Sequence, residues 1–258
     1  MSDWGKGVIN DIGWGQGADN NIGWGSIYAK SNAGETLLKS DLNTDAFIIE
    51  VDTSKAGVSN NNQFQFTGAE GDYDVVAKQN DIVVATFNDL SNQETITLPS
   101  SGVYDLEVKS KEVNGFNRIA FNNGGDRGKL TYIKQWGTIA WSSFERAFFG
   151  SSNLDLEALD NPDLSLVSRT DLMFINCSII NPNMRNWDVS NLRNMSFMVQ
   201  GTSMSVENLT ACYENWSQLN LQQNVTFTAT IKYNASGQAG RDILVNTYNW
   251  NITDGGQV

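Results

Sequence analysis

Few residues in this chain have the chemistry to catalyse a reaction. The 258 residues include no histidine and only two cysteines, Cys177 and Cys212. The absence of histidine excludes serine–histidine and cysteine–histidine catalysis and histidine-ligated metals. The cysteine spacing fits no metal-ligand motif, so we expect two buried free thiols. The sequence therefore predicts no catalytic, cofactor-binding or metal-binding residue and a protein that is not an enzyme.

Carboxylates are the remaining candidates for acid–base chemistry, and several gather in the segment LDLEALDNPD. A glycosidase needs two carboxylates at a fixed separation in a cleft, which a cluster along the chain does not supply. Oxygen ligands of this type also suit Ca²⁺, although the spacing does not match an EF-hand loop. We interpret the segment as solvated turns, with a calcium site as the alternative. The residues concerned are Asp155, Glu157, Asp160 and Asp163.

Charge and hydropathy narrow the classes of partner. The net charge is −12, which opposes binding to nucleic acid or to anionic lipid. No apolar run approaches the roughly 20 residues that a membrane span needs. The N-terminal sequence MSDWGKGVINDIGWG has neither a basic start nor an apolar run, so we expect no signal peptide.

Residues 1–40 contain an internal repeat with a period of ten, in which each Trp is followed by Gly. The segment has too few apolar residues to form a core, yet a flexible linker would not keep Trp and Ile at fixed spacing. We predict an extended arm whose large apolar side chains dock into pockets on a partner, the alternative being an arm folded onto its own domain. The predicted partner-anchoring residues are Trp4, Trp14, Trp24, Ile12 and Ile22.

Residues 44–112 read as short strands separated by turn sequences, which predicts a small β-sandwich. The run TITLPSSGVYDLEVKS resembles the closing hairpin of a PKD-like, immunoglobulin-type sandwich. That resemblance implies a last strand with a YxLxV pattern after a turn that contains Gly. The predicted strands are AFIIEV (46–51), NQFQFTG (62–68), YDVVAK (73–78), DIVVATF (81–87), ETITLP (94–99) and VYDLEV (103–108).

Residues 113–258 contain a longer repeat, with a period of 25 or 26. Such a period, with apolar residues at equivalent places, is typical of a leucine-rich-repeat solenoid. The position of Gly150 suits a turn with left-handed backbone geometry. We expect Trp136, Trp141 and Trp187 in the core. The equivalent residues are Trp141, Val167 and Leu192; Phe144, Thr170 and Met195; Ala147, Met173 and Met198; Phe148, Phe174 and Val199; and Gly150, Asn176 and Gly201.

The segment WDVSNLRNMSFMVQG resembles the WDVSNVTNMSxMFxG units of BspA-like surface proteins, a variant of the leucine-rich repeat. Residues 121–141 resemble the start of such an array and residues 214–256 its C-terminal cap. Two departures, Thr170 in place of Met and Val199 in place of Phe, predict irregular middle turns.

The cap is expected to contain a helix in the segment SGQAGRDILVNTYNW, with Ser236 as its N-cap. The segment NWNITDGG should return as a last strand. The residues expected near one face of this helix are Ala239, Ile243, Leu244 and Thr247.

The predicted organisation is mainly β: an extended arm (1–40), a PKD/Ig-like sandwich (44–112) and a capped leucine-rich-repeat solenoid (113–258). The Trp-Gly arm resembles the N-termini of structural proteins in tailed phages. That resemblance implies a virion protein, such as a head or tail fibre, made in the host cytoplasm and carried on the extracellular particle. Its expected partners are other virion proteins (capsid, portal, tail or fibre subunits), a host-surface glycan or protein, and its own copies in a trimer. The alternative is a bacterial surface or secreted BspA-like adhesin.

Overall fold

The computed structural model describes residues 28–30, 36–38 and 45–258, which fall into two units, 1–43 and 44–258. In the first unit, β1 (Tyr28–Lys30) and β2 (Thr36–Leu38) pair as an antiparallel hairpin, with Tyr28 opposite Leu38. The rest of the segment that we predict to be an arm lies outside the described residues. All further description concerns the second unit.

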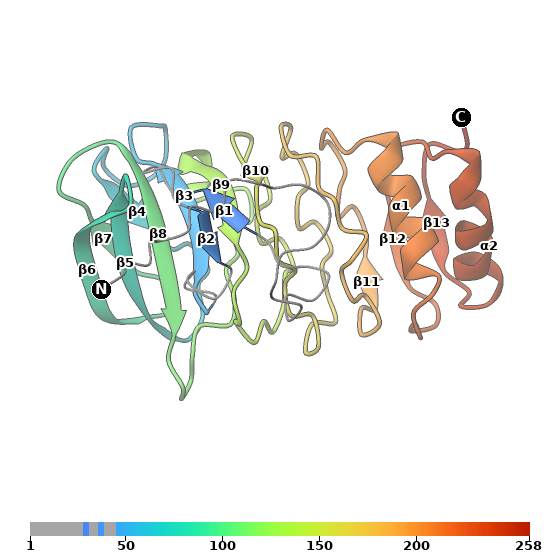
Figure 1. Cartoon of the computed structure of the whole chain (residues 1–258), viewed down its shortest axis with the longest axis horizontal. Coiled ribbons are helices and arrows are strands. Elements are labelled where there is room, and N and C mark those ends of the chain that lie inside the picture. Colours follow the sequence, from blue (N-terminus) through green and yellow to red (C-terminus); the bar gives the residue numbers. More distant parts are fainter. Residues whose placement is uncertain (1–27, 31–35, 39–44) are drawn as a thin grey trace, which may run out of the picture. The chain divides into compact units, whose positions relative to one another are not determined.

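The first half of the second unit is an antiparallel sheet faced by a second, two-stranded sheet, β4-β7 (Figure 1). All six strands predicted from sequence are present, and buried positions alternate with less buried ones along β3 and β5. Phe66 packs edge-on against Tyr73, which joins the two layers. The strands are β3 (Phe47–Asp52), β4 (Gln63–Gln65), β5 (Asp72–Gln79), β6 (Ile82–Ser91), β7 (Thr95–Thr97) and β8 (Val103–Ser110).

The large sheet continues into the repeats without a break. Its strand order is β10-β9-β3-β8-β5-β6, where β9 is Leu130–Gln135 and β10 is Asp155–Leu156. β9 pairs antiparallel with β3 on one side and parallel with β10 on the other. One buried cluster extends from Phe47 to Trp250, so the sandwich and the repeats share a single core.

The repeats stack through a regular ladder of backbone hydrogen bonds. In the first step the donors at 144, 146, 148 and 150 reach acceptors 25 residues ahead, and in the second step the donors at 170, 172, 174 and 176 reach acceptors 24 residues ahead. The predicted register is therefore confirmed. The predicted irregularity of the middle turns is wrong, because Thr170 and Val199 are fully buried in the same stack and Thr170 donates a hydrogen bond to the Met198 sulfur at 3.3 Å.

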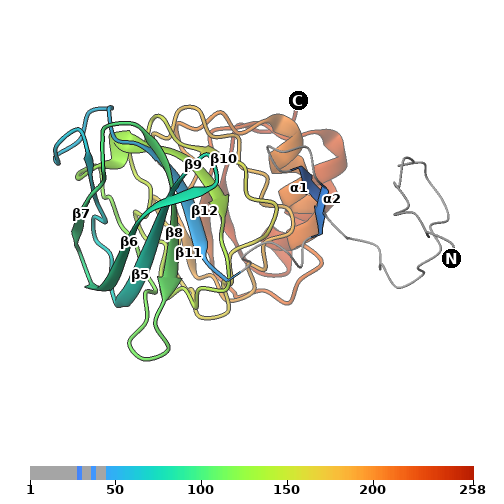
Figure 2. The ribbon, with the colours of Figure 1, turned by 60° about the vertical axis from the view of Figure 1, so that its left-hand side comes forward.

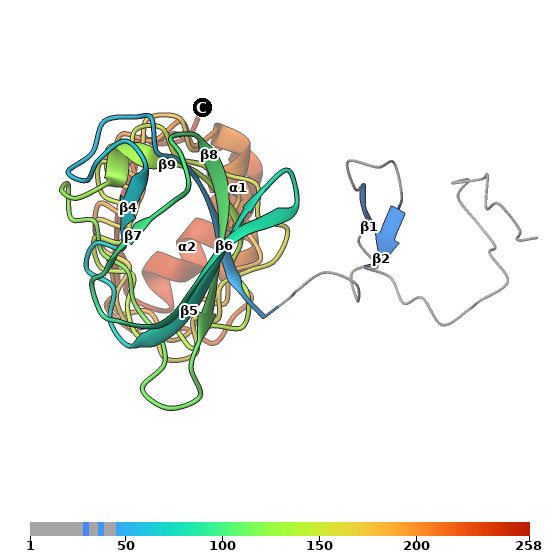
Figure 3. The same ribbon diagram turned by 90° about the vertical axis from the view of Figure 1, so that its left-hand side faces the viewer.

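The core positions of the repeats are occupied by side chains that are at most 2% exposed, including Trp136, Trp141 and Trp187. Phe148 and Phe174 stack with ring centroids 5.6 Å apart. Both cysteines are free and buried, as the sequence predicts. Figure 3 looks along this stack, with the strands of the sandwich in front of the repeats.

Two helices and three short parallel strands close the array. The strands are β11 (Asn194–Met195), β12 (Thr226–Thr228) and β13 (Asn251–Thr253). The last of them, β13, confirms the strand predicted in NWNITDGG. The helices are α1 (Val206–Trp216) and α2 (Gln238–Asn246), with 3-10 turns at Ala235–Gly237 and, before β9, at Arg127–Lys129. In the described part of the chain, no helix has the length and apolarity to cross a membrane.

The details predicted for the second helix are mostly wrong. Ser236 lies inside the preceding 3-10 turn, so it does not cap α2. Of the four residues predicted to share a face, only Leu244 is buried, beside Gly240. A Cβ added to Gly240 would lie 2.3 Å from the Tyr213 backbone oxygen, so the close approach of α1, rather than apolar periodicity, decides the buried face.

Candidate functional site

Each repeat is built from two consecutive β-turns. In the first repeat the backbone N–H of Ala147 donates to the oxygen of Phe144, and the N–H of Ser151 donates to the oxygen of Phe148. These four residues point into the core. The residues between them form the outer surface of the turns.

The first turn of each repeat places an ordinary side chain in left-handed backbone geometry. Arg146, Leu172 and Phe197 have φ values of 57°, 60° and 56°. They occupy the third position of their turns, where glycine or asparagine is usual when φ is positive. A bulky residue there carries roughly 1–2 kcal/mol of backbone strain.

The second turn of each repeat also needs a positive φ at its third position, and there the chain has glycine or asparagine. Gly150 and Gly201 have φ values of 78° and 73°, with Asn176 at 60° between them. This confirms the left-handed geometry predicted for that position. A Cβ added to Gly150 would lie 2.3 Å from the side-chain oxygen of Asn123, and one added to Gly201 would lie 2.8 Å from that of Asn176.

The strained residues of the first turns form one exposed column. The ladder puts equivalent residues side by side on successive repeats, about 4.8 Å apart as in a parallel sheet. The Arg146 side chain is 45% exposed, Phe197 is 45% exposed and Leu172 is partly exposed. Phe149 and Ile175, on the outer side of the second turns, are also partly exposed. We call this surface the turn face and define it by Arg146, Phe149, Leu172, Ile175 and Phe197.

Ion pairs border the turn face. Arg169 forms a two-pronged contact with Asp171, with both N–O distances at 2.9 Å, and lies 3.1 Å from Glu145. The hydrogen bond to Asp171 raises the pKa of the Arg169 guanidinium. Arg146 donates to the side-chain oxygen of Asn122 at 3.1 Å. Arg146 also lies 3.8 Å from Glu145. The face therefore offers apolar side chains beside arginines that are paired with carboxylates.

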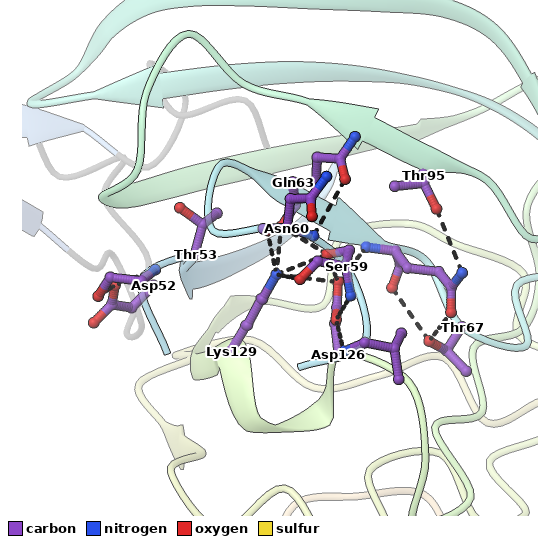
Figure 4. Close-up of polar contacts among 12 residues, drawn as sticks. Asp52, Thr53, Ser59, Asn60, Gln63, Thr67, Thr95, Asp126 and Lys129 are labelled. Atoms are coloured by element: carbon purple, nitrogen blue, oxygen red, sulfur yellow. Dashed lines mark hydrogen bonds and ion pairs between the residues drawn. The ribbon is translucent and has the colours of Figure 1, made fainter. Parts of the chain in front are cut away.

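A second polar cluster lies where the sandwich meets the repeats (Figure 4). Asp126 and Lys129 are both fully buried, with 3.6 Å between the Lys129 nitrogen and a carboxylate oxygen. Lys129 also donates to the backbone oxygens of Ser59, Asn60 and Gln63 at 3.1, 2.8 and 2.8 Å.

The carboxylate of this cluster is equally well satisfied. Asp126 accepts the backbone N–H groups of Val58, Ser59 and Gln65 at 2.8, 3.0 and 2.7 Å, and the Ser59 hydroxyl as well. A pair of charges this buried and this fully hydrogen-bonded fixes a loop instead of exchanging protons with a substrate. The cluster is structural: it holds residues 58–65 against the start of the repeats.

The remaining polar features of the described residues are weaker candidates for a functional site. A shallow depression of about 330 Å³ is lined by Asp72, Asp89, Leu90, Lys111 and Val113. Lys111 is engaged there, because the hydrogen bond from Lys111 to Asp74 raises the lysine's pKa. A lysine held in its charged form is a poor general base.

Carboxylates of the acidic segment bind backbone groups. Asp160 accepts the N–H groups of Trp136 and Gly137, the latter at 2.9 Å. Asp163 accepts the N–H of Ser165 two residues ahead, at 2.9 Å. Among the described residues, no group of three acidic or cysteine side chains has a geometry that could hold a metal ion.

Sequence reasoning placed its candidate site elsewhere. Trp4, Trp14, Trp24, Ile12 and Ile22 lie outside the described residues, so their anchoring role stays a prediction. The turn face was missed, although a signal was present: two positions after the three aligned core residues, the chain has Arg, Leu and Phe where a turn favours Gly. The buried cluster was missed as well, because charged residues among glycines in GGDRGKL look solvent-exposed.

The fold and this face together define a class: a short β-solenoid of turn repeats, fused to a sandwich and closed by a helical cap. Within it, residues 120–239 match the family described as Mycoplasma protein of unknown function, DUF285. No curated protein and no solved structure matches the chain. The match covers the repeats and part of the cap, and it links this region to the BspA-like surface proteins that its motif resembles. It does not extend to the sandwich or to residues 1–40, so the PKD-like and phage resemblances stay predictions.

Proposed function

We propose that this chain is a BspA-like surface protein, without enzymatic activity, that binds a protein ligand through the turn face. The observation that carries the proposal is the column formed by Arg146, Leu172 and Phe197. Three successive repeats keep a large side chain in strained left-handed geometry, although glycine would relieve the strain. Strain that the surrounding structure maintains at exposed positions is typical of functional surfaces.

The chemistry of the face favours a protein as ligand. Aromatic and arginine side chains are enriched at the centres of protein–protein interfaces, and the turn face contains Phe149, Phe197 and Arg146. The ladder of backbone hydrogen bonds fixes the backbone of the turns, so little backbone freedom is lost on binding. Arg169, which is paired with Asp171 at the border of the turn face, adds specificity through charge.

Binding of the labelled full chain to cultured epithelial cells tests the proposal. We expect saturable binding that trypsin treatment of the cells removes, because the ligand is a protein. The variant Leu172→Asp/Phe197→Asp should raise the apparent Kd at least tenfold. The matched control Leu159→Asp/Leu166→Asp changes two leucines that are 69% and 68% exposed elsewhere, and it should bind as the wild type does.

Three results would contradict the proposal: no saturable binding, binding that survives trypsin, or equal affinities for the two variants. Survival after trypsin, combined with loss after glycan removal, would point to a glycan ligand instead.

A virion role is a second candidate, and the ten-residue Trp-Gly period of residues 1–40 favours it. In that case the apolar side chains Trp4, Trp14 and Trp24 would anchor the chain to other virion proteins. Deleting residues 1–30 should then leave a folded body that no longer enters particles. Particles that retain normal amounts of the shortened chain would exclude the anchoring role.

A further inference from the structure

The strand β6 ends the large sheet and has a neighbour, β5, on one side only among the described strands (Figure 2). Its segment 82–87 reads IVVATF, with no charge and no proline. Ile82 is 67% and Val83 is 53% exposed. Natural sheets usually block such an edge with lysine, proline, a β-bulge or a very short strand, because its free N–H and C=O groups pair readily with another strand. Segment 82–87 has no lysine or proline, and its one irregularity, at the pairs of Ala77 and Lys78, has to be accommodated in any pairing with another strand.

The pairing of β6 with β5 shows which face of the sheet each side chain occupies. Phe87 lies opposite the buried Val75, and Ala85 opposite the buried Ala77, so both point to the core side. Val83 lies opposite Lys78, on the outer side. Thr86 lies opposite Val76, on the outer side. The irregularity between the pairs at 77 and 78 shifts the alternation by one residue, so that Val84 as well as Ala85 packs on the core side and Ile82 follows on the core side.

This alternation selects one register for a two-fold pair of β6 strands. Residues directly opposite each other in an antiparallel pair lie on the same face. A pairing centred between Val84 and Ala85 matches core-side with core-side residues and outer with outer. Moving the centre by half a residue in either direction would put core-side residues opposite outer ones.

Charge agrees with the same register. It places Asp81 opposite Asn88 and Asp89 opposite Asn80, so each carboxylate faces an amide. A centre half a residue later, on Ala85, would place Asp81 of one copy opposite Asp89 of the other. Like charges directly opposite destabilise a sheet, and the chain already carries a net charge of −12.

We propose that two copies of this chain pair through β6 into one continuous twelve-stranded sheet, twice the six strands of a single copy. The occupant of the edge is thus a second copy in two-fold symmetry, in place of the trimer that the virion reading implies. The pairs across the interface are Ile82 with Phe87, Val83 with Thr86, and Val84 with Ala85.

Sedimentation velocity of the full chain across the micromolar range tests this proposal. The wild type should sediment as a dimer. In Val83→Lys/Thr86→Lys the introduced lysines face each other twice, and the dimer Kd should rise at least tenfold. In Val83→Lys/Thr86→Glu each lysine faces a glutamate of the other copy, and the dimer should be retained.

A control separates local pairing from overall charge. Leu159→Lys/Leu166→Lys adds the same two positive charges at other exposed sites, and it should remain dimeric. Adding positive charge to an acidic chain reduces general repulsion, so loss of the dimer in the first variant alone identifies the β6 contact. A monomeric or trimeric wild type, or equal behaviour of the two β6 variants at an unchanged unfolding midpoint, would overturn the proposal.

Discussion

The buried Asp126–Lys129 cluster and the turn face each contain a feature that is unfavourable in isolation. Two charges are removed from water in the first, and left-handed geometry is imposed on bulky residues in the second. The cluster compensates fully, because Asp126 and Lys129 each make several hydrogen bonds. The strain at Phe197 has no comparable set of hydrogen bonds, and Phe197 is 45% exposed. Under the proposed function, the comparison separates a feature kept for stability from one kept for binding.

Breaking the cluster should have the largest effect. Lys129→Met removes the cation and three hydrogen bonds to backbone oxygens, and it leaves Asp126 charged and buried. We expect the free energy of unfolding to fall by roughly 5 kcal/mol, measured by urea denaturation. The matched control Lys134→Met removes a lysine that is 29% exposed and should cost about 1 kcal/mol or less. Equal losses in the two variants would show that burial of the pair is unimportant.

Truncating the core beneath the turn face should be next in size. Phe148→Ala and Phe174→Ala each remove a fully buried ring from the repeat stack, and each should cost about 4 kcal/mol. Phe197→Ala removes an exposed ring from the same repeats and should change stability by about 0.5 kcal/mol or less. An unchanged unfolding midpoint for Phe148→Ala would contradict the register.

Sequence patterns predicted the parts of the fold in which residues at regular intervals occupy the same kind of environment. Alternation of apolar and polar residues along VYDLEV and YDVVAK predicts β8 and β5, and the 25-residue period predicts the stacked repeats. The helix α1 was not predicted, although Leu209, Tyr213 and Trp216 have helical spacing and Ser205 caps it by accepting the N–H of Asn208 at 3.2 Å. The repeat alignment ended at residue 205 and the cap resemblance began at residue 214, so no helix was predicted over the residues of α1.

The candidate site could be predicted far less well, because it depends on backbone geometry that side-chain types do not reveal. Leu172 and Phe197 look like core residues in the sequence, and only their positive φ turns them outward. The continuous core across residue 112 was also missed, because β9 reaches back to β3 over more than 75 residues. Pairing at that distance leaves no local signal.

Relieving the strain should give a smaller effect of opposite sign. Leu172→Gly and Phe197→Gly each remove a bulky side chain from left-handed geometry, partly offset by the greater freedom of glycine in the unfolded chain. We expect each to stabilise the protein by about 0.5–1 kcal/mol, measured by thermal unfolding. Gly201→Ala, four residues from Phe197, should destabilise, because its φ is 73° and the added Cβ would lie 2.8 Å from Asn176. The same sign for Phe197→Gly and Gly201→Ala would refute the strain argument.

The smallest effect concerns the thiols inside the repeats. Burial raises the pKa of Cys177 to about 12 and also raises that of Cys212. Iodoacetamide should therefore leave both unmodified in the native protein at about pH 8 and modify both in urea, as measured by mass spectrometry. The unfolded chain releases a thiol proton near its ordinary pKa of about 8.5, so the free energy of unfolding should fall as pH rises above that value. Rapid modification of the native protein would contradict the buried position.

The binding isotherm of Leu172→Gly/Phe197→Gly on cultured epithelial cells tests the central claim most directly. The two substitutions relieve strain and remove the apolar part of the column together. We predict a variant that unfolds at a higher temperature than the wild type and binds at least ten times more weakly. A variant that binds as tightly as the wild type would show that the strained side chains serve no recognition, and would contradict the account.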